Sequence, residues 1–233
     1  MPRQSSKSLA KKGKPKPRKF YTISYSLRHG LADFEVENLD VLCMGARVLG
    51  PPEGGRGFPI YPEMPRVVIG KRRKGPPPSA IELFHHYWLI SDGLKRLFES
   101  LDADAFAFQP CDVTLRDGSP GPTHWLCHVV RVIEAFGEKT MDEIEAYRRQ
   151  TGVRRVSSIY TENLVFNEEA IGSARIFRTP YSDLVFCDQS LKDACKAAGL
   201  KGIAFRDCFP KGKRVTPPPP SPLHPQGSKS LHD

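Results

Sequence analysis

Residues 86–108 read HYWLISDGLKRLFESLDADAFAF, and this stretch decides the fold class. The apolar run before Ser91 is typical of a strand, and serine is a favourable N-cap for the helix that follows. The spacing of a helix that buries one face is then met by Leu94, Leu97, Phe98 and Leu101. The segment at 105–108 returns to the composition of a strand. The stretch therefore predicts a strand–helix–strand unit.

The same unit recurs 97 positions later, as DLVFCDQSLKDACKAAGLKGIAF at residues 183–205. Asp188 takes the N-cap position of Ser91, and the apolar helix face is repeated by Leu191, Ala194, Cys195 and Ala198. Gly199 replaces Asp102 near the helix end, where glycine can adopt the left-handed conformation. Duplication of one unit and the general pattern of such units are both open explanations. Either one favours a mixed β-sheet with packed helices, that is, an α+β fold.

Other segments fit around these two units. Further strands are expected at 20–27, 67–69, 125–132, 159–166 and 174–177. Capping boxes at 79–82 and 140–143 predict two more helix starts, and Gly152 is expected just beyond the end of the second helix.

Composition divides the chain into one domain and two tails. Residues 1–19 are rich in Lys, Ser and Pro and residues 209–233 in Pro, so both are expected to be disordered. Residues 20–208 are expected to form a single α+β domain. Within it, residues 49–78 form a Pro- and Gly-rich connector, for which a solvated linker and a partner-binding loop are both open.

The net charge of +9 belongs to the tails, which carry +8 and +3 and leave −2 for residues 20–208. A basic N-terminal tail could bind nucleic acid through phosphate contacts, and a nucleic-acid-associated protein is the alternative function. The tail has no interleaved aromatic residues for base stacking, which argues against this partner.

The sequence also predicts a compartment. No apolar run approaches the roughly 20 residues of a membrane helix, and no secretory signal is present. The six cysteines then indicate free thiols in a reducing cytoplasm.

The sequence does not support a catalytic or a metal-binding site. The best metal candidate combines His124, Cys127 and His128, with His85, His86 and Cys111 available from elsewhere. Zinc sites usually recruit closely spaced ligand pairs such as CxxC, and on a strand Cys127 would face away from the two histidines. The nucleophile-elbow, Walker, dinucleotide and HExxH motifs are missing as well. We therefore expect no metal, no cofactor and no enzymatic activity.

The segments 90–97 (ISDGLKRL), 106–108 (FAF), 174–178 (ARIFR), 184–188 (LVFCD) and 199–205 (GLKGIAF) resemble the bacterial immunity protein 11 family of polymorphic toxin systems. The resemblance covers roughly residues 79–208, and the connector and the C-terminal tail depart from it. It implies a protein that binds a cognate toxin domain and neutralises it by occlusion.

The partner surface that this resemblance would require is less defined. Because toxins that act on nucleic acids are commonly basic, an acidic surface is expected on their inhibitors. The candidate partner-binding residues are Glu138, Asp142, Glu143 and Glu145. The alternative interpretation is that helices favour acidic residues in their first turn.

Overall fold

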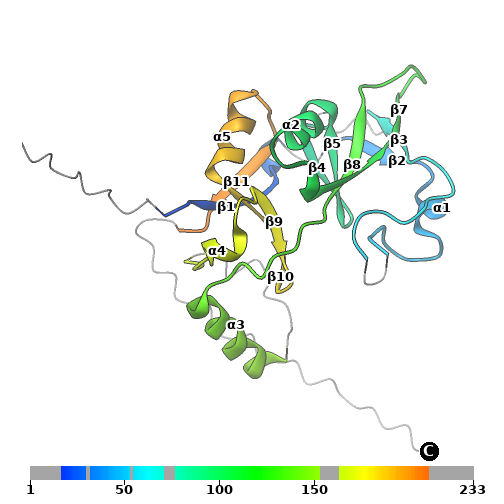
Figure 1. The fold of residues 1–233 in the computed structure, drawn as a ribbon. Helices are drawn as coiled ribbons and strands as arrows, with labels where there is room; N and C mark the ends of the chain where they lie inside the picture. Colours follow the sequence, from blue (N-terminus) through cyan, green and yellow to red (C-terminus); the bar gives the residue numbers. More distant parts are fainter. Residues whose placement is uncertain (1–16, 30–31, 53–54, 71–76, 153–162, 210–233) are drawn as a thin grey trace, which may run out of the picture.

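The computed structural model describes residues 17–29, 32–52, 55–70, 77–152 and 163–209. Within them, eleven strands form three sheets, accompanied by five α-helices and two short 3-10 helices, Leu27–His29 and Ala103–Ala105 (Figure 1). This content confirms the predicted α+β class. No helix in the described ranges has both the length and the apolar character needed to cross a membrane.

One four-stranded sheet is built around the first strand–helix–strand unit. Its order is β4 (Ile81–Phe84), β5 (Tyr87–Ser91), β8 (His124–Val129) and β6 (Phe106–Pro110). Helix α2 (Asp92–Asp102) connects β5 to β6, and β8 lies between these two strands, antiparallel to both. The Ser91 side chain accepts the Leu94 N–H, as a helix N-cap does. The predicted unit and its cap are therefore confirmed.

A second four-stranded sheet contains the second unit. Its order is β9 (Ile176–Thr179), β10 (Ser182–Asp188), β1 (Phe20–Tyr25) and β11 (Ile203–Asp207). Helix α5 (Gln189–Ala197) connects β10 to β11, and β1 lies between them. The Asp188 side chain accepts the Leu191 N–H at 3.0 Å. Gly199 follows α5 with φ +67°, the left-handed conformation predicted for it.

The two sheets share their strand order and also their register. In the first sheet Trp125 of β8 pairs with Ile90, and in the second Tyr21 of β1 pairs with Cys187, 97 positions after Ile90. Across the other edge, Phe108 faces Cys127, and Phe205 faces Ile23. The repeat therefore extends to the central strands, although β8 follows its unit in the chain and β1 precedes both units.

A third sheet of three strands supports the connector. Strand β3 (Arg66–Ile69) pairs antiparallel with β2 (Phe34–Val36) and parallel with β7 (Asp112–Leu115). Side chains of this sheet, including Val67 and Val113, share a buried cluster with Leu89 and Leu126 of the first sheet. The cluster also holds Leu42 of α1 (Leu39–Cys43). Burial on this side fixes α1 and the connector against β5 and β8.

Two further helices lie beside the second sheet. Helices α3 (Glu138–Thr151) and α4 (Glu168–Ile171) contribute Ile144 and Ile171 to an apolar cluster that also contains Phe177 and Phe186. Arg18, from the segment predicted as N-terminal tail, pairs with Asp188 at 3.1 Å beside this cluster. Gly152 follows α3 directly, as predicted, and adopts the left-handed conformation.

Two predicted helix starts are wrong. At 79–82 the Ser79 N–H does donate to Glu82 Oε1 at 2.9 Å, as in a capping box, but the chain continues as strand β4. The fully buried Ile81 pairs with Ile90 there, and this burial outweighs the local signal. At 140–143 the helix already begins at Glu138 after the N-cap Gly137, and the Thr140 hydroxyl accepts the Val165 N–H at 2.7 Å.

The remaining strand predictions have different outcomes. The strands predicted at 67–69 and 125–132 correspond to β3 and β8, and the one at 174–177 is found two residues later as β9. Half of the strand predicted at 159–166 lies outside the described residues, and in the described half, 163–166, Phe166 makes only an isolated bridge to Phe136.

Candidate functional site

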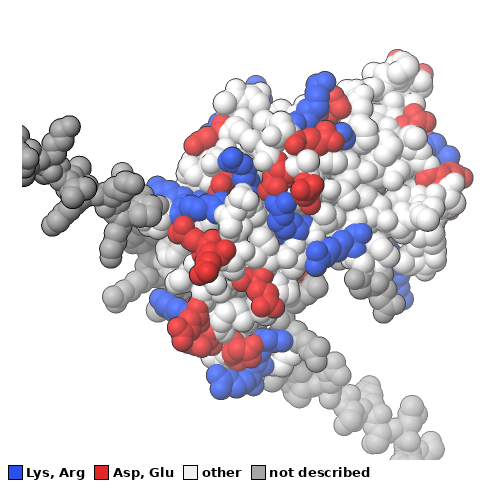
Figure 2. All heavy atoms as spheres, in the orientation of Figure 1, with Lys and Arg blue, Asp and Glu red and all other residues white. Residues whose placement is uncertain are grey.

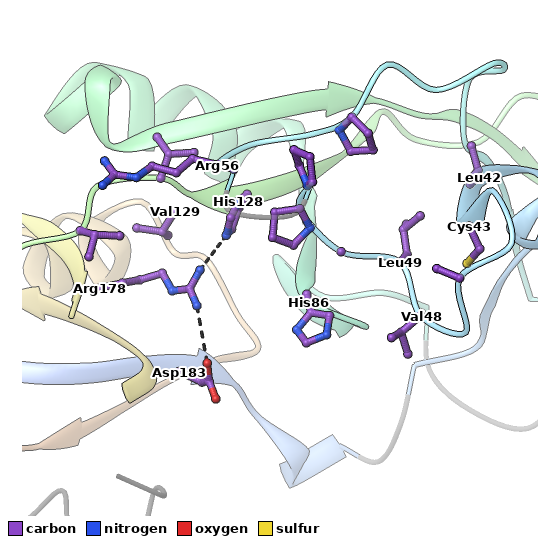
Figure 3. A pocket seen from close by; sticks show the side chains of 18 of the residues that line it. Leu42, Cys43, Val48, Leu49, Arg56, His86, His128, Val129, Arg178 and Asp183 are labelled. Atoms are coloured by element: carbon purple, nitrogen blue, oxygen red, sulfur yellow. Dashed lines mark hydrogen bonds and ion pairs between the residues drawn. The ribbon is translucent and has the colours of Figure 1, made fainter. Parts of the chain in front are cut away.

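A cleft of about 810 Å3 opens between the α1–connector segment and the edge of β8, β9 and β10 (Figure 3). One wall comes from the end of α1 and the loop after it, including Leu42, Met44 and Val48. The other comes from His128 and the residues after β8, and from the β9–β10 hairpin with Arg178 and Asp183. The cleft thus joins three segments that are far apart in the sequence.

The connector wall of the cleft is apolar and exposed. Met44 and Val48 keep 56% and 49% of their surface accessible, and nearby Ile60 keeps 96%. Of the nine large apolar side chains exposed in the described part of the chain, five lie between residues 41 and 64: Val41, Met44, Val48, Ile60 and Met64. Of these five, Met44 and Val48 line the cleft.

The opposite end of the cleft is polar. Figure 3 shows Arg56, His128, Arg178 and Asp183 gathered there, away from Leu42 and Val48. The Arg178 guanidinium lies 2.7 Å from His128 Nε2, and its Nη2 lies 3.8 Å from Asp183 Oδ1. Asp183 is 71% exposed, so its attraction to Arg178 is weakened by water. Among the described residues that line the cleft, this end holds two arginines and one carboxylate.

His128 is neutral in this setting. Burial, together with the charge of Arg178, lowers the pKa of His128 to about 4. The Gly57 N–H donates to its Nδ1 at 3.0 Å, and the Tyr87 hydroxyl donates to the Gly57 carbonyl. A neutral imidazole accepts at one nitrogen only, so Gly57 and Arg178 compete for that acceptor role. His128 therefore anchors the connector and faces Arg178 without neutralising it.

Backbone strain accompanies the apolar rim. Three residues other than glycine have positive φ in the described ranges: Met44 at +48°, His85 at +54° and Asn163 at +69°. Met44 lines the cleft, and His85 precedes the cleft residue His86 in the β4–β5 turn. Left-handed backbone disfavours side chains with a Cβ, and glycine is the usual residue at a helix C-terminus such as that of α1. The chain keeps a methionine there, which presents a large apolar side chain at the cleft.

The residues considered for a metal site are not brought together. On β8, His124 and His128 share one face and Cys127 lies on the other, in the core with Trp88, as the sequence predicted. His124 Nδ1 lies 2.7 Å from the Pro122 carbonyl oxygen. In the part of the chain that the structure describes, no three potential metal ligands meet.

The cysteines are poorly placed for chemistry. All six are free thiols, and four of them are buried. Burial raises the pKa of Cys111 to about 12 and of Cys195 to about 11. Thiols with such raised pKa values are weak nucleophiles near neutral pH.

The four predicted partner-binding acids all lie exposed on α3. Glu138, Asp142 and Glu145 follow one another at four and three residues and so share one face, whereas Glu143 lies on the neighbouring face. Glu145 also pairs with Arg148. Figure 2 shows acidic and basic side chains interspersed over the region of α3. The structure therefore forms an acidic stripe of three residues, with arginines at the far end of the helix.

Sequence reasoning named two residues of the cleft, His86 and His128, but only as candidate metal ligands, and it did not select the others. The signal that pointed to a binding surface was the unusual connector, for which a partner-binding loop was one of two interpretations. The basic tail that supports the nucleic-acid alternative lies, for residues 1–16, outside the described ranges.

Comparison with known proteins supplies one match. The model of an immunity protein family, Imm11, matches residues 19–209, which is most of the chain. No curated protein matches the sequence.

Proposed function

The chain belongs to the Imm11 immunity protein family, and from this premise we propose that it binds a cognate bacterial toxin domain and neutralises it by occlusion. The observation that carries the proposal is the family match over residues 19–209, which contains both strand–helix–strand units and the cleft. The protein would act as a rigid surface that covers the toxin's working site.

Binding rather than catalysis is the proposed mode of action. The cysteine thiols have raised pKa values, and the two histidines of β8 serve packing and connector contacts. The described surface instead offers features of recognition: the exposed side chains of Met44 and Val48 in the wall of a cleft, and an acidic stripe on a surface helix. Aromatic and long apolar anchors with polar neighbours are the usual basis of tight protein binding.

The acidic stripe of α3, formed by Glu138, Asp142 and Glu145, is proposed to face a basic region of the toxin. A toxin that acts on nucleic acid carries positive charge where its substrate binds, and acidic side chains on the inhibitor would both steer and hold it. Charges on an exposed helix act mainly on the rate of association. We therefore propose that the stripe speeds association with the toxin and contributes only a minor part of the binding affinity.

The proposed site of action is the bacterial cytoplasm. Six free cysteines are compatible with a reducing compartment. An immunity protein also has to bind the toxin in the compartment that contains the toxin's target.

Co-expression tests the proposal. The toxin domain encoded beside this protein is placed under an inducible promoter, with and without this chain, and an unrelated toxin domain serves as the specificity control. We expect growth to be restored only with the cognate domain, and the two proteins to co-purify as a stable complex. Absence of both rescue and co-purification would reject the proposed function.

A further inference from the structure

We propose that strand β11 pairs with the β11 strand of a second copy of this chain. The two strands run antiparallel across a twofold axis, so that the second sheets of the two copies become one continuous sheet. Such a pair forms without the toxin and is therefore independent of the proposed function. Three features of β11 support it: an open edge, a sequence that is complementary to itself, and a contrast with the matching strand of the first sheet.

Strand β11 is an open edge of the second sheet. It pairs with β1 on one side and with no other strand in the described chain. The Ser26 N–H donates to the Gly202 carbonyl, and the bonded pairs of an antiparallel ladder alternate along it. The N–H and C=O groups of Ile203 and Phe205 therefore point away from β1, and they have no hydrogen-bond partner among the described residues. Unpaired backbone of this kind is a template for another extended chain.

The sequence of this edge, KGIAFRD, is complementary to itself. One antiparallel register places Ala204 opposite the second copy's Ala204. Ile203 then lies opposite the second copy's Phe205, and the two residues exchange both hydrogen bonds of a ladder pair. Lys201 lies opposite the second copy's Asp207, so opposite charges meet at both ends of the interface. The edge therefore fits its own copy in backbone, apolar contact and charge.

The side chains that this register uses are available in the free protein. Lys201 is exposed, and its ammonium group has no ion-pair partner in the described ranges. One oxygen of Asp207 accepts the Phe209 N–H at 2.7 Å, which leaves the other oxygen for a cation. Ile203 and Phe205 pack on the core but are only partly buried, so a second copy would cover more of their apolar surface.

The neighbouring register is not complementary. A register centred on Phe205 places Ile203 opposite Asp207 and Ala204 opposite Arg206. In the proposed register Arg206 lies opposite a glycine instead. The two Arg206 residues are then about 14 Å apart, which exceeds the screening length of about 8 Å at physiological salt.

The matching strand of the first sheet lacks these features. Strand β6 takes the place of β11 in the strand order. The Cys111 N–H donates to the His124 carbonyl, so the preceding residue, Pro110, points its backbone away from β8. Proline has no N–H to offer there, and it is one of the residues that protect edge strands from pairing. The equivalent register would place Asp104 opposite Pro110. The self-complementary edge thus distinguishes β11 from β6.

Sedimentation velocity of the purified full-length chain tests the pairing. Two five-residue strands form a contact smaller than a standard interface, so we expect a reversible dimer with a dissociation constant on the order of 50 µM. The mass should rise from monomer to dimer over a concentration series that spans this value.

Charge reversal tests the register. Lys201→Glu and Asp207→Lys each place like charges at both ends of the interface, and each should raise the dimer dissociation constant about tenfold. A mixture of these two variants restores opposite charges at both ends, so a heterodimer should form about as well as the wild-type dimer. Ala204→Lys brings two ammonium groups to the point of closest approach and should abolish pairing. Lys196→Glu is the matched control, because Lys196 is exposed on α5 and not on the edge. Circular dichroism checks that each variant is folded.

Each outcome either supports the pairing or overturns it. A wild-type dimer that the single variants lose and their mixture regains supports it. A wild type that stays monomeric throughout the series overturns it, as does a dimer that Ala204→Lys retains. Loss in both charge variants without recovery in the mixture overturns the proposed register. A monomeric wild type whose binding to the toxin domain is lost in Ala204→Lys overturns the pairing in favour of a toxin strand on the same edge. Because the pairing does not involve the toxin, absence of a dimer leaves the proposed function intact, and absence of growth rescue leaves the pairing intact.

Discussion

Lys95 and Lys192, 97 positions apart in the chain, each hold an ammonium group over an aromatic ring of the central strand of their own sheet. Lys95 Nζ lies 4.5 Å from the ring centre of Trp125 on β8, and Lys192 Nζ lies 3.5 Å from that of Tyr21 on β1. The same two rings also contact the first helical residue. The Trp125 N–H donates to Asp92, and the Tyr21 hydroxyl donates to Gln189.

This shared arrangement favours duplication of one unit as the explanation, rather than the general pattern of strand–helix–strand units. A general preference for such units explains a capped helix between two strands, but it does not explain the same lysine over the same central-strand position. The central strands come from different places in the chain, so a duplication would also require that one of them was relocated or exchanged.

Replacing either lysine by methionine should destabilise the protein by about 1 kcal/mol, because a partly buried cation–π contact contributes roughly this much. Methionine keeps most of the apolar stem, so the change reports the charge, which at Lys95 also forms an ion pair with Glu99. Lys196→Met, at an exposed position of α5, is the control and should cost less than about 0.5 kcal/mol. Urea unfolding of the three variants measures the differences. Equal effects of all three substitutions would show that the ring contacts contribute nothing specific.

Gly202 lies where the two sheets meet, and its substitution should be far more costly than that of a glycine in open space. A Cβ at Gly202 would lie 1.9 Å from Ser79 Oγ, and the residue has φ +82°. Gly118 has the same φ of +82° with no atom within 4 Å of its Cβ position, which makes it a matched control. We expect Gly118→Ala to cost about 1 kcal/mol and Gly202→Ala about 3 kcal/mol or more.

The double variant Ser79→Gly, Gly202→Ala identifies the cause. Removing the Ser79 side chain takes away the clash and should recover much of the stability lost in Gly202→Ala, as measured by thermal unfolding. Failure to recover any stability would place the cost in the backbone conformation instead.

The two units could be predicted because their signals are local. Each N-cap, Ser91 in the first unit and Asp188 in the second, lies within a dozen residues of the apolar helix face that follows it, so one window of sequence holds the pattern of each unit. The insertion of β1 between β10 and β11 could not be foreseen in this way. Phe20 pairs with Asp188, and nothing in either segment specifies a partner so distant in the chain.

Packing between distant segments explains both the wrong helix start at 79–82 and the failure to predict the cleft. The Ser79 N–H donates to Glu82 Oε1, which is one of the two contacts of a capping box, yet Ile81 is buried against β5 and the segment forms a strand. Local hydrogen bonds are thus overridden by packing that the sequence window does not contain. The cleft combines Met44 with Arg178, which are brought together only by the packing of the connector on the first sheet. Residues that are neighbours in space alone carry no pattern in the sequence.

The stability of the fold should depend on pH through His128. Its pKa is about 4 in the folded protein and close to 6.5 in an unfolded chain, so the unfolded state binds the proton first as the pH falls. The free energy of unfolding should therefore be largest above pH 6.5 and decrease between pH 6.5 and 4, by about 3 kcal/mol in all. His128→Asn can still accept the Gly57 N–H but does not titrate.

Denaturant unfolding of wild type and His128→Asn at pH 7, 6 and 5 measures this dependence. The variant should be less stable at pH 7, because it changes a buried contact of the connector, and the difference should shrink toward pH 5. A wild-type stability that does not change between pH 7 and 5 would contradict the buried neutral histidine.

The acidic stripe of α3 should act on the rate at which the toxin associates. Neutralising it with Glu138→Gln, Asp142→Asn and Glu145→Gln together should slow association about tenfold at low ionic strength and change the dissociation rate little. The effect should fade above about 0.5 M salt, where charges are screened within a few ångströms. Stopped-flow mixing with the toxin domain measures both rates.

Glu143→Gln separates a directed stripe from simple net charge. Glu143 lies on the same helix but on the neighbouring face, so its neutralisation removes one charge without touching the stripe. Asp142→Asn alone is the comparison, because it also removes one charge at the adjacent position. If the stripe faces the toxin, Asp142→Asn should slow association clearly more than Glu143→Gln. Equal slowing by both would mean that only the overall charge of the helix attracts the toxin, and no slowing by the triple variant would remove α3 from the interface.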